Sequence, residues 1–210
     1  LGERGIDVDI VGGDRNSDDA RRRAGETDLV WMCGALYADM DRSGDLDHDV
    51  VAAPVFTGET APVYHSVIVS TPGGAATITD ALAGTVAVNE AVSWSGHRAL
   101  RRHVAPRWFA GEIATGSHAG SLRAVADGRA DCASIDHSIW DAELRAGHSI
   151  TDRLRVIDRT TDWPAPPLLV RRGLDGPMRR SIATALLDLG PLTGITSLAI
   201  ATASDYEVMT

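Results

Sequence analysis

Short apolar runs alternate with stretches of helical periodicity along most of this chain. Apolar runs of three to five residues, bounded by polar or turn residues, are typical of buried strands. Segments of this kind are Asp28 to Met32, Asp49 to Ala53, Ser66 to Val69, Thr85 to Val88, Ile113 to Thr115, Cys132 to Ile135, Leu154 to Ile157 and Leu168 to Val170. Helical patterns cover Gly96 to Val104, His118 to Asp127, Ser138 to Arg145 and Pro177 to Leu189. This alternation predicts βαβ units and therefore an α/β fold whose sheets are mainly parallel.

Two segments rich in turn residues divide this pattern. The cluster Thr71 to Gly74 follows an apolar run and predicts the exit of the chain from a first lobe. The proline-rich segment Trp163 to Pro167 predicts its return. A complete β-α-β-α-β-α-β set lies between these marks. We therefore predict a discontinuous first lobe, residues 1–72 and 158–210, with a second lobe, residues 73–157, inserted into it.

Composition and charge narrow the function classes. The 210 residues carry a net charge of -9, which argues against a nucleic-acid partner. No apolar run approaches the length of a transmembrane helix, and no secretory signal is visible, although the chain starts at Leu1 rather than at a methionine. The two cysteines, Cys33 and Cys132, have no CxxC partner and predict buried free thiols rather than a metal site.

Small and polar residues follow three of the predicted strands. Ser93 to Gly96 lie between the strand that ends at Asn89 and a helix, His118 opens the next helix, and Asp136 follows a third strand. Loops at the carboxyl ends of parallel strands collect at one edge of a sheet, where ligands bind. A helix N-terminus with nearby hydroxyl groups holds oxyanions well. The alternative for Ser93, Ser95 and Asp136 is that they only cap helices.

Several motifs, taken in order, resemble the phosphate/phosphite/phosphonate substrate-binding family. The matching stretches are Trp31 to Gly34 with Tyr37, Tyr64 to Val69, Val88 to Gly96, Gly116 to Val125 and Gly128 to Asp136. The resemblance spans roughly residues 28 to 210. It implies a two-lobed type II periplasmic-binding-protein fold, in which each α/β lobe has a mainly parallel sheet flanked by helices.

The resemblance also implies a function and a cellular setting. A small oxyanion, namely phosphate, phosphite or a phosphonate, would be captured between the lobes for uptake by an ABC permease. The protein would be a monomer without catalytic activity, cofactor or metal. Its location would be extracytoplasmic, periplasmic or on the cell surface, while a cytoplasmic location stays open because no signal peptide is visible.

Eight residues are implied as ligand contacts by the resemblance. Ser93 and Ser95 would bind the anionic head group, with backbone N–H groups around Gly96. Tyr37 and Tyr64 would contact it from the other lobe. At the far end, where an amine or another tail could be recognised, the lining residues would be His118 and Asp136. Trp94 stands where the family often has a small polar residue between the two serines, which predicts a narrower pocket.

Three other functions are alternatives for this sequence. The segment Asp39 to Val50 follows the calcium-loop spacing of EF-hands through position nine, but position twelve is Val50 rather than glutamate. An enzyme on the same fold, such as a chorismate dehydratase or a thiamine-pyrimidine synthase acting on a small carboxylate, would need His118 or Asp136 as acid or base. An effector-sensing domain of a transcription regulator is the third alternative, although no helix-turn-helix segment is visible.

Overall fold

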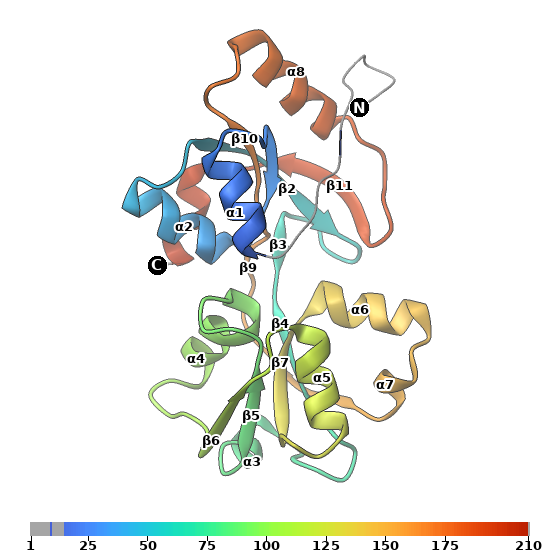
Figure 1. Ribbon diagram of the computed structural model, residues 1–210. Coiled ribbons are helices and arrows are strands. Elements are labelled where there is room, and N and C mark those ends of the chain that lie inside the picture. The colour runs from blue at the N-terminus through green and yellow to red at the C-terminus, as the bar shows by residue number, and fades with distance from the viewer. Residues whose placement is uncertain (1–8, 10–14, 210) are drawn as a thin grey trace. The chain divides into compact units, whose positions relative to one another are not determined.

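The computed structural model describes Asp9 and residues 15–209, which fall into two compact units (Figure 1). Unit 1 contains the described residues up to Pro62 and those from Pro164 onward, whereas unit 2 is the continuous segment Val63–Trp163. The lobes expected from the sequence were residues 1–72, 73–157 and 158–210. The first boundary between the units thus lies after residue 62, ten residues before the predicted position at 72. The second lies after residue 163, six residues beyond the predicted position at 157.

The shift of the first boundary has one structural cause. Strand β4 (Ser66–Ser70), which the sequence analysis assigned to the first lobe, pairs with strands β7 and β8 of unit 2. Its five residues are all buried. A fully buried strand has the same apolar sequence pattern in either sheet, so the pattern could not identify its neighbours.

Unit 2 is built around a five-stranded sheet with the order β6-β5-β7-β4-β8. The strands are β4, β5 (Thr85–Val88), β6 (Gly111–Ala114), β7 (Cys132–Asp136) and β8 (Arg155–Arg159). Strand β5 pairs in parallel with both β6 and β7, whereas β4 pairs antiparallel with β7 and β8. The expected parallel arrangement thus holds for the three strands that precede the candidate ligand loops.

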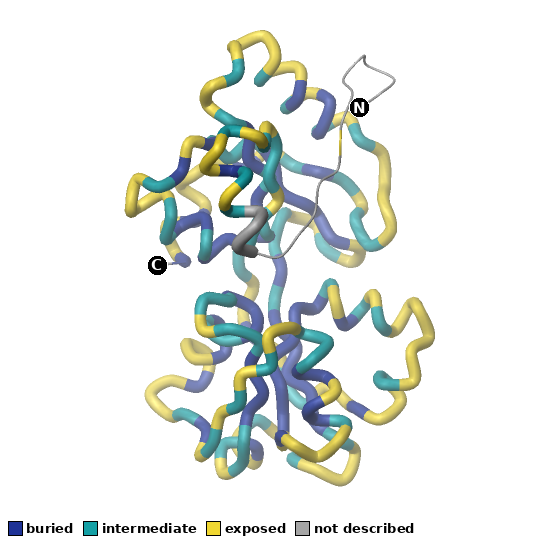
Figure 2. The backbone as a smooth tube through the Cα atoms, in the orientation of Figure 1, coloured by how far each residue is buried: buried dark blue, intermediate teal, exposed yellow. Residues whose placement is uncertain are grey.

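Both faces of this sheet are covered, which explains its continuous apolar runs. On β4, Val67 and Val69 belong to one core cluster with Leu122, while Ile68, between them, belongs to another with Leu100. Figure 2 shows the central strands β5, β7 and β4 of unit 2 as largely buried, within a more exposed surface. The helical segments of unit 2 are α3 (Ile78–Ala81), η2 (Trp94–Arg98), α4 (Ala99–Val104), α5 (His118–Ala126), α6 (His137–Ala146) and α7 (Ser149–Asp152).

Unit 1 has a four-stranded sheet with the order β1-β10-β2-β11 among its described residues. Its elements are α1 (Arg15–Arg23), β1 (Leu29–Trp31), α2 (Gly34–Ser43), β2 (His48–Phe56), β10 (Leu168–Arg171), α8 (Gly176–Leu187), β11 (Ile195–Ile200) and η3 (Ala203–Met209). The described strand pairs of this sheet are antiparallel, so the prediction of a mainly parallel sheet was wrong for them. Both β1 and β2 pair with β10, a strand that comes more than a hundred residues later, and no local sequence pattern reveals such a partner.

The chain passes between the units through two short strands. These are β3 (Val63–Tyr64) and β9 (Trp163–Pro164), which pair with each other. None of the helices in the described residues has the length and apolar character that a membrane span requires. Within unit 2, the parallel strands β5, β6 and β7 end at the same edge of the sheet, and this edge is the candidate position for a ligand.

Candidate functional site

Three loops of unit 2 meet at the carboxyl ends of its parallel strands. The loop after β5 carries Ser93–Gly96, the loop after β6 leads to His118, and β7 ends at Asp136. Because β5 lies between the other two strands, the sheet brings residues that are far apart in sequence together. Six of the eight predicted contacts belong to these loops, namely Ser93, Trp94, Ser95, Gly96, His118 and Asp136.

A hydrogen-bonded group links the first two loops. The Oγ atom of Ser95 and the Nδ2 atom of Asn89 each lie 3.3 Å from Nε2 of His118. The backbone N–H of Asp136 points to Nδ1 of His118 at a longer 3.5 Å. Burial lowers the pKa of His118, and the nearby carboxylate of Asp136 opposes this shift without cancelling it. The imidazole therefore favours its neutral form, and the hydrogen-bonding atoms of this group are uncharged apart from the carboxylate of Asp136.

Asn89 is a site residue that the sequence analysis did not select. It directly follows strand β5, and its Oδ1 atom is buried without a hydrogen-bond partner in the described structure. A Cβ atom added to Gly96 would lie 1.5 Å from this oxygen, which no side chain could tolerate. Gly96 is thus required so that the first turn of η2 can lie against the amide of Asn89. Asn89 and Gly96 are seven positions apart in the sequence, and only the folded loop shows that they touch.

The two serines of this loop have different roles in the structure. Ser93 Oγ accepts a hydrogen bond from the backbone N–H of Gly96 at 3.1 Å and so caps η2. Ser95 is buried, and its hydroxyl lies beside His118. Ser93 therefore caps the helix, as the capping alternative predicted, whereas the side chain of Ser95 belongs to the hydrogen-bonded group with Asn89 and His118.

Asp136 also has a capping role. Its Oδ1 atom accepts hydrogen bonds from the backbone N–H and the hydroxyl of Ser138, at 2.9 and 2.8 Å, at the start of α6. The side chain is largely buried, at 12% exposure. The carboxylate is thus held in place beside His118 by the helix that follows it.

Trp94 packs within unit 2 against aromatic and cationic groups. Its ring meets that of Trp163 edge to face, with the centroids 4.7 Å apart, and the guanidinium of Arg102 lies 5.3 Å from its centroid. Trp94 is 1% exposed, and its indole N–H has no acceptor in the described structure. Trp94 is therefore accommodated at the start of η2 by its edge-to-face contact with Trp163 and its contact with Arg102. Whether it narrows a ligand pocket stays a prediction.

The two predicted tyrosines belong to different units. Tyr37, on α2 of unit 1, is buried and packs edge to face on Tyr206 with ring centroids 5.3 Å apart, and burial raises its pKa. Tyr64, on β3, is buried in unit 2, the unit that also carries the serine loop. The assignment of Tyr64 to the other lobe was therefore wrong, because the boundary between the two units precedes β3. Whether Tyr64 contacts a ligand stays a prediction.

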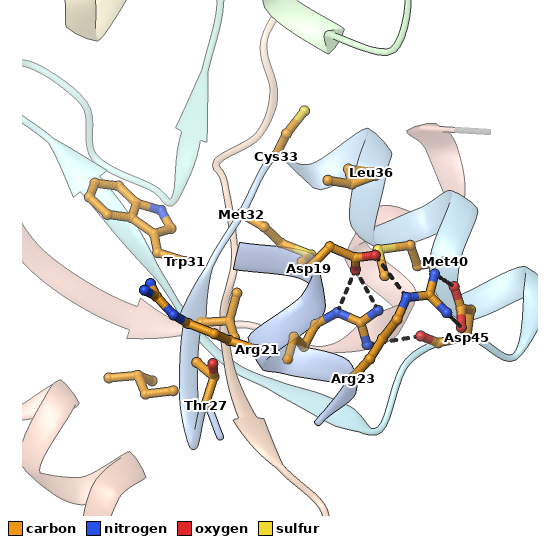
Figure 3. Close-up of a pocket in the computed structure, with 13 residues that line it drawn as sticks. Asp19, Arg21, Arg23, Thr27, Trp31, Met32, Cys33, Leu36, Met40 and Asp45 are labelled. Carbon is orange, nitrogen blue, oxygen red and sulfur yellow. Dashed lines mark hydrogen bonds and ion pairs between the residues drawn. The ribbon is translucent and has the colours of Figure 1, made fainter. Parts of the chain in front are cut away.

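A pocket of about 510 Å³ lies in unit 1 and contains none of the eight predicted residues (Figure 3). Its apolar part includes Trp31, Met32 and Cys33, between α1, β1 and α2. At one side of the pocket in Figure 3, Arg23 binds the carboxylates of both Asp19 and Asp45. Arg23, the arginine at this side of the pocket, is therefore paired with two carboxylates rather than open to an anion.

The acidic segment that resembles a calcium loop forms other contacts. Helix α2 continues through it to Ser43, and Gly44 ends the helix in a left-handed conformation. Its carboxylates pair with arginines, including Asp49 with Arg172 at 2.7 Å. Within the described residues, no three ligand groups of this segment converge, so the calcium alternative is not supported.

Comparison with known proteins gives a family and a fold. The profile of the family described as "ABC transporter, phosphonate, periplasmic substrate-binding protein" matches residues 4–207. No curated protein matches the chain. A binding-protein component of an ABC phosphonate transporter from Pseudomonas aeruginosa superposes with a TM-score of 0.77 at 17% identity, covering 98% of this chain and 74% of its own.

Two further solved structures have the same fold. The protein PhnD1 of Prochlorococcus marinus, in complex with methylphosphonate, has a TM-score of 0.78 at 14% identity and covers 99% of this chain and 85% of its own. A protein from Xanthomonas citri bound to chloride has a TM-score of 0.69 at 17% identity, covering 92% and 78%. The type II periplasmic-binding fold expected from the motifs is thereby confirmed.

Proposed function

Because this chain belongs to the family of periplasmic substrate-binding proteins of phosphonate ABC transporters, we propose that it captures a small phosphonate, with phosphate and phosphite as competing ligands. The observation that carries this proposal is the group formed by Ser95, His118 and Asn89 at the carboxyl ends of the parallel strands. The solved relative from Prochlorococcus marinus binds methylphosphonate, which supports the same ligand class here.

The arrangement suits an oxyanion bound without a lysine or arginine. The Ser95 hydroxyl and the backbone N–H groups at the start of η2 supply neutral donors, and fixed dipoles of this kind stabilise anions. When the backbone N–H of Asp136 donates to Nδ1 of the neutral His118, Nε2–H donates to Ser95 Oγ and leaves the hydroxyl hydrogen of Ser95 for the ligand. The carboxylate of Asp136 would repel a second negative charge and favour a ligand whose tail is neutral or cationic.

The proposed role is binding without catalysis. An enzyme on this fold would need a free acid or base beside the substrate, yet His118 lies among Ser95 and Asn89, and Asp136 is engaged in capping α6. We further propose that the protein acts as a monomer outside the cytoplasmic membrane and delivers its ligand to an ABC permease. Family membership supports the location and the permease partner, and the net charge of -9 supports the absence of a nucleic-acid partner.

Calorimetric titration tests the proposal. We expect heat of binding with methylphosphonate or aminoethylphosphonate, weaker binding of phosphate and phosphite, and none with sulfate or acetate. Loss of one hydrogen bond to the charged ligand in Ser95→Ala should weaken binding about tenfold. Ser70→Ala is the matched control, since Ser70 is equally buried but donates to the carbonyl of Asp131 at the opposite edge of the sheet.

Two outcomes would contradict the proposal. Binding of carboxylates alone would favour the enzyme or sensor alternatives. Equal phosphonate affinity in Ser95→Ala, Ser70→Ala and the wild type would show that the ligand binds elsewhere.

A further inference from the structure

Two buried serines contact the ligand loop from the sheet below it. Ser66 on β4 and Ser134 on β7 each donate a hydroxyl hydrogen bond to the backbone carbonyl of Ser95, at 2.8 and 2.6 Å. They are 1% and 0% exposed. Burying a hydroxyl group is unfavourable unless it is hydrogen-bonded, so both side chains depend on this one carbonyl as acceptor.

The carbonyl that they hold lies in an unusual turn. The hydrogen bonds from Arg98 N to Ser93 O and from Ala99 N to Trp94 O each span five residues, which makes η2 a π-helical turn. Turns of this type are rare and occur mostly at functional sites. Both lone pairs of the Ser95 carbonyl are directed to the strands, so the position of this turn is fixed to β4 and β7.

Hydrogen bonds also fix strand β4 to its neighbours at Ser66. The backbone N–H of Ser66 donates to Oγ1 of Thr160 at 3.0 Å, and the N–H of Thr160 donates to the carbonyl of Ser66 at 2.9 Å. Ser66 also pairs in register with Asp136, the last residue of β7. The contact from Ser66 to Ser95 therefore joins the loop to the edge of the sheet where the candidate site lies.

We infer that Ser66 and Ser134 are positioning residues of the ligand site, which hold the Ser95 carbonyl so that the Ser95 hydroxyl and the N–H groups of η2 face the bound phosphonate. This role rests on the proposed function. It differs from a general contribution to stability, because the same strand carries a serine that serves as a comparison. Ser70 on β4 is also fully buried and also donates to one carbonyl, that of Asp131, at 2.8 Å, but it has no contact with the loop.

The test compares Ser66→Ala and Ser134→Ala with Ser70→Ala. Each variant loses one buried hydrogen bond, so we expect similar shifts of the urea midpoint in all three. Affinity for methylphosphonate, measured by calorimetry well below the unfolding transition, should fall about ten- to hundredfold in Ser66→Ala and Ser134→Ala, the loss typical when groups that orient direct ligand contacts are removed. Ser70→Ala should bind as the wild type does.

A double variant tests whether Ser134 acts through Ser95. The affinity lost through Ser134→Ala should be smaller in a Ser95→Ala background, because the hydroxyl that Ser134 helps to place is then already missing. A purely structural role would give the same loss in both backgrounds. If Ser134→Ala does not fold, Ser134→Cys keeps the volume with a weaker donor and should bind less tightly than the wild type.

The possible results separate the two proposals. A wild-type protein that binds no phosphonate would overturn the proposed function and the positioning role together. A wild-type protein that binds methylphosphonate, with unchanged affinity in Ser66→Ala and Ser134→Ala, would overturn the positioning role alone.

Discussion

The two units use polar side chains in different ways. Unit 1 has arginines bound to carboxylates near its surface, as in the contacts of Arg172 and Arg179 with Asp49. Unit 2 also has exposed ion pairs, such as that of Arg153 with Asp127, but in addition it has buried neutral groups around the Ser95 carbonyl and the His118 imidazole. Exposed ion pairs contribute little free energy, whereas buried hydrogen bonds are costly to break.

This contrast bears on how an anion could be bound by a chain whose 20 basic residues are all arginine. In unit 1, arginine charges such as that of Arg23 are neutralised by aspartates and so are not free for a ligand. In unit 2, the candidate site has hydroxyl, amide and backbone donors instead. An abundance of arginine therefore does not by itself indicate where an anion binds.

The largest effect should follow Gly96→Ala in unit 2. The new Cβ atom would collide with Asn89 and force the amide or the turn to move, with a loss of stability of about 1–3 kcal/mol. Displacement of the turn should also abolish measurable phosphonate binding. Calorimetry and urea unfolding would measure both effects. The control is Gly73→Ala, where an added Cβ meets nothing within 4 Å and the wild-type values should persist.

Acid should destabilise the units in separate pH ranges. In unit 2, burial, the stacked ring of His137 and the charge of Arg159 lower the pKa of His65 to about 4, against the opposing carboxylates of Asp162 and Asp141. The unfolded chain binds a proton near pH 6.5, so the stability that neutral His65 provides is present above that pH and is lost as the pH falls toward 4.

In unit 1 the sign is the same, but the loss comes at a lower pH. Burial acts to raise the pKa of Asp49, but the hydrogen bond and charge of Arg172 and the charge of Arg179 outweigh it and lower the pKa. The stability from Asp49 is therefore present above the usual pKa of 3.8 and is lost only below it. Urea unfolding at a series of pH values should show a decline between pH 6.5 and 4 that His65→Gln reduces. An unchanged decline in this variant would contradict the role of His65.

The smallest effect should follow Asp49→Asn in unit 1. Its partner Arg172 is about half exposed, so the lost ion pairs should cost less than about 1 kcal/mol, and added salt should reduce the difference further. Phosphonate affinity should not change. A loss of several kcal/mol in urea unfolding would show that the arginine contacts of unit 1 are as important as the buried hydrogen bonds of unit 2.

The candidate site was predictable where the residues carry a local signal. Ser93 to Gly96 follow an apolar run and open a helix, and this pattern was compatible with an anion-binding loop or with simple helix capping, while the family resemblance pointed to the ligand role. His118 and Asp136 were found in the same way, because each follows a strand. Asn89, Ser66 and Ser134 were missed, because an amide at a strand end or a serine within an apolar strand has no distinguishing pattern before its neighbours are known.

By itself the sequence determined that the chain forms an α/β fold, where most strands and helices lie, and the family to which it belongs, since these depend on local periodicity and ordered motifs. Only the tertiary structure decided that β4 joins the sheet of unit 2, that the described strand pairs of unit 1 are antiparallel, and that Ser66 and Ser134 meet at the Ser95 carbonyl. The physical reason is that strand pairing and buried hydrogen bonds join residues distant in sequence, and the choice of partner depends on packing in three dimensions.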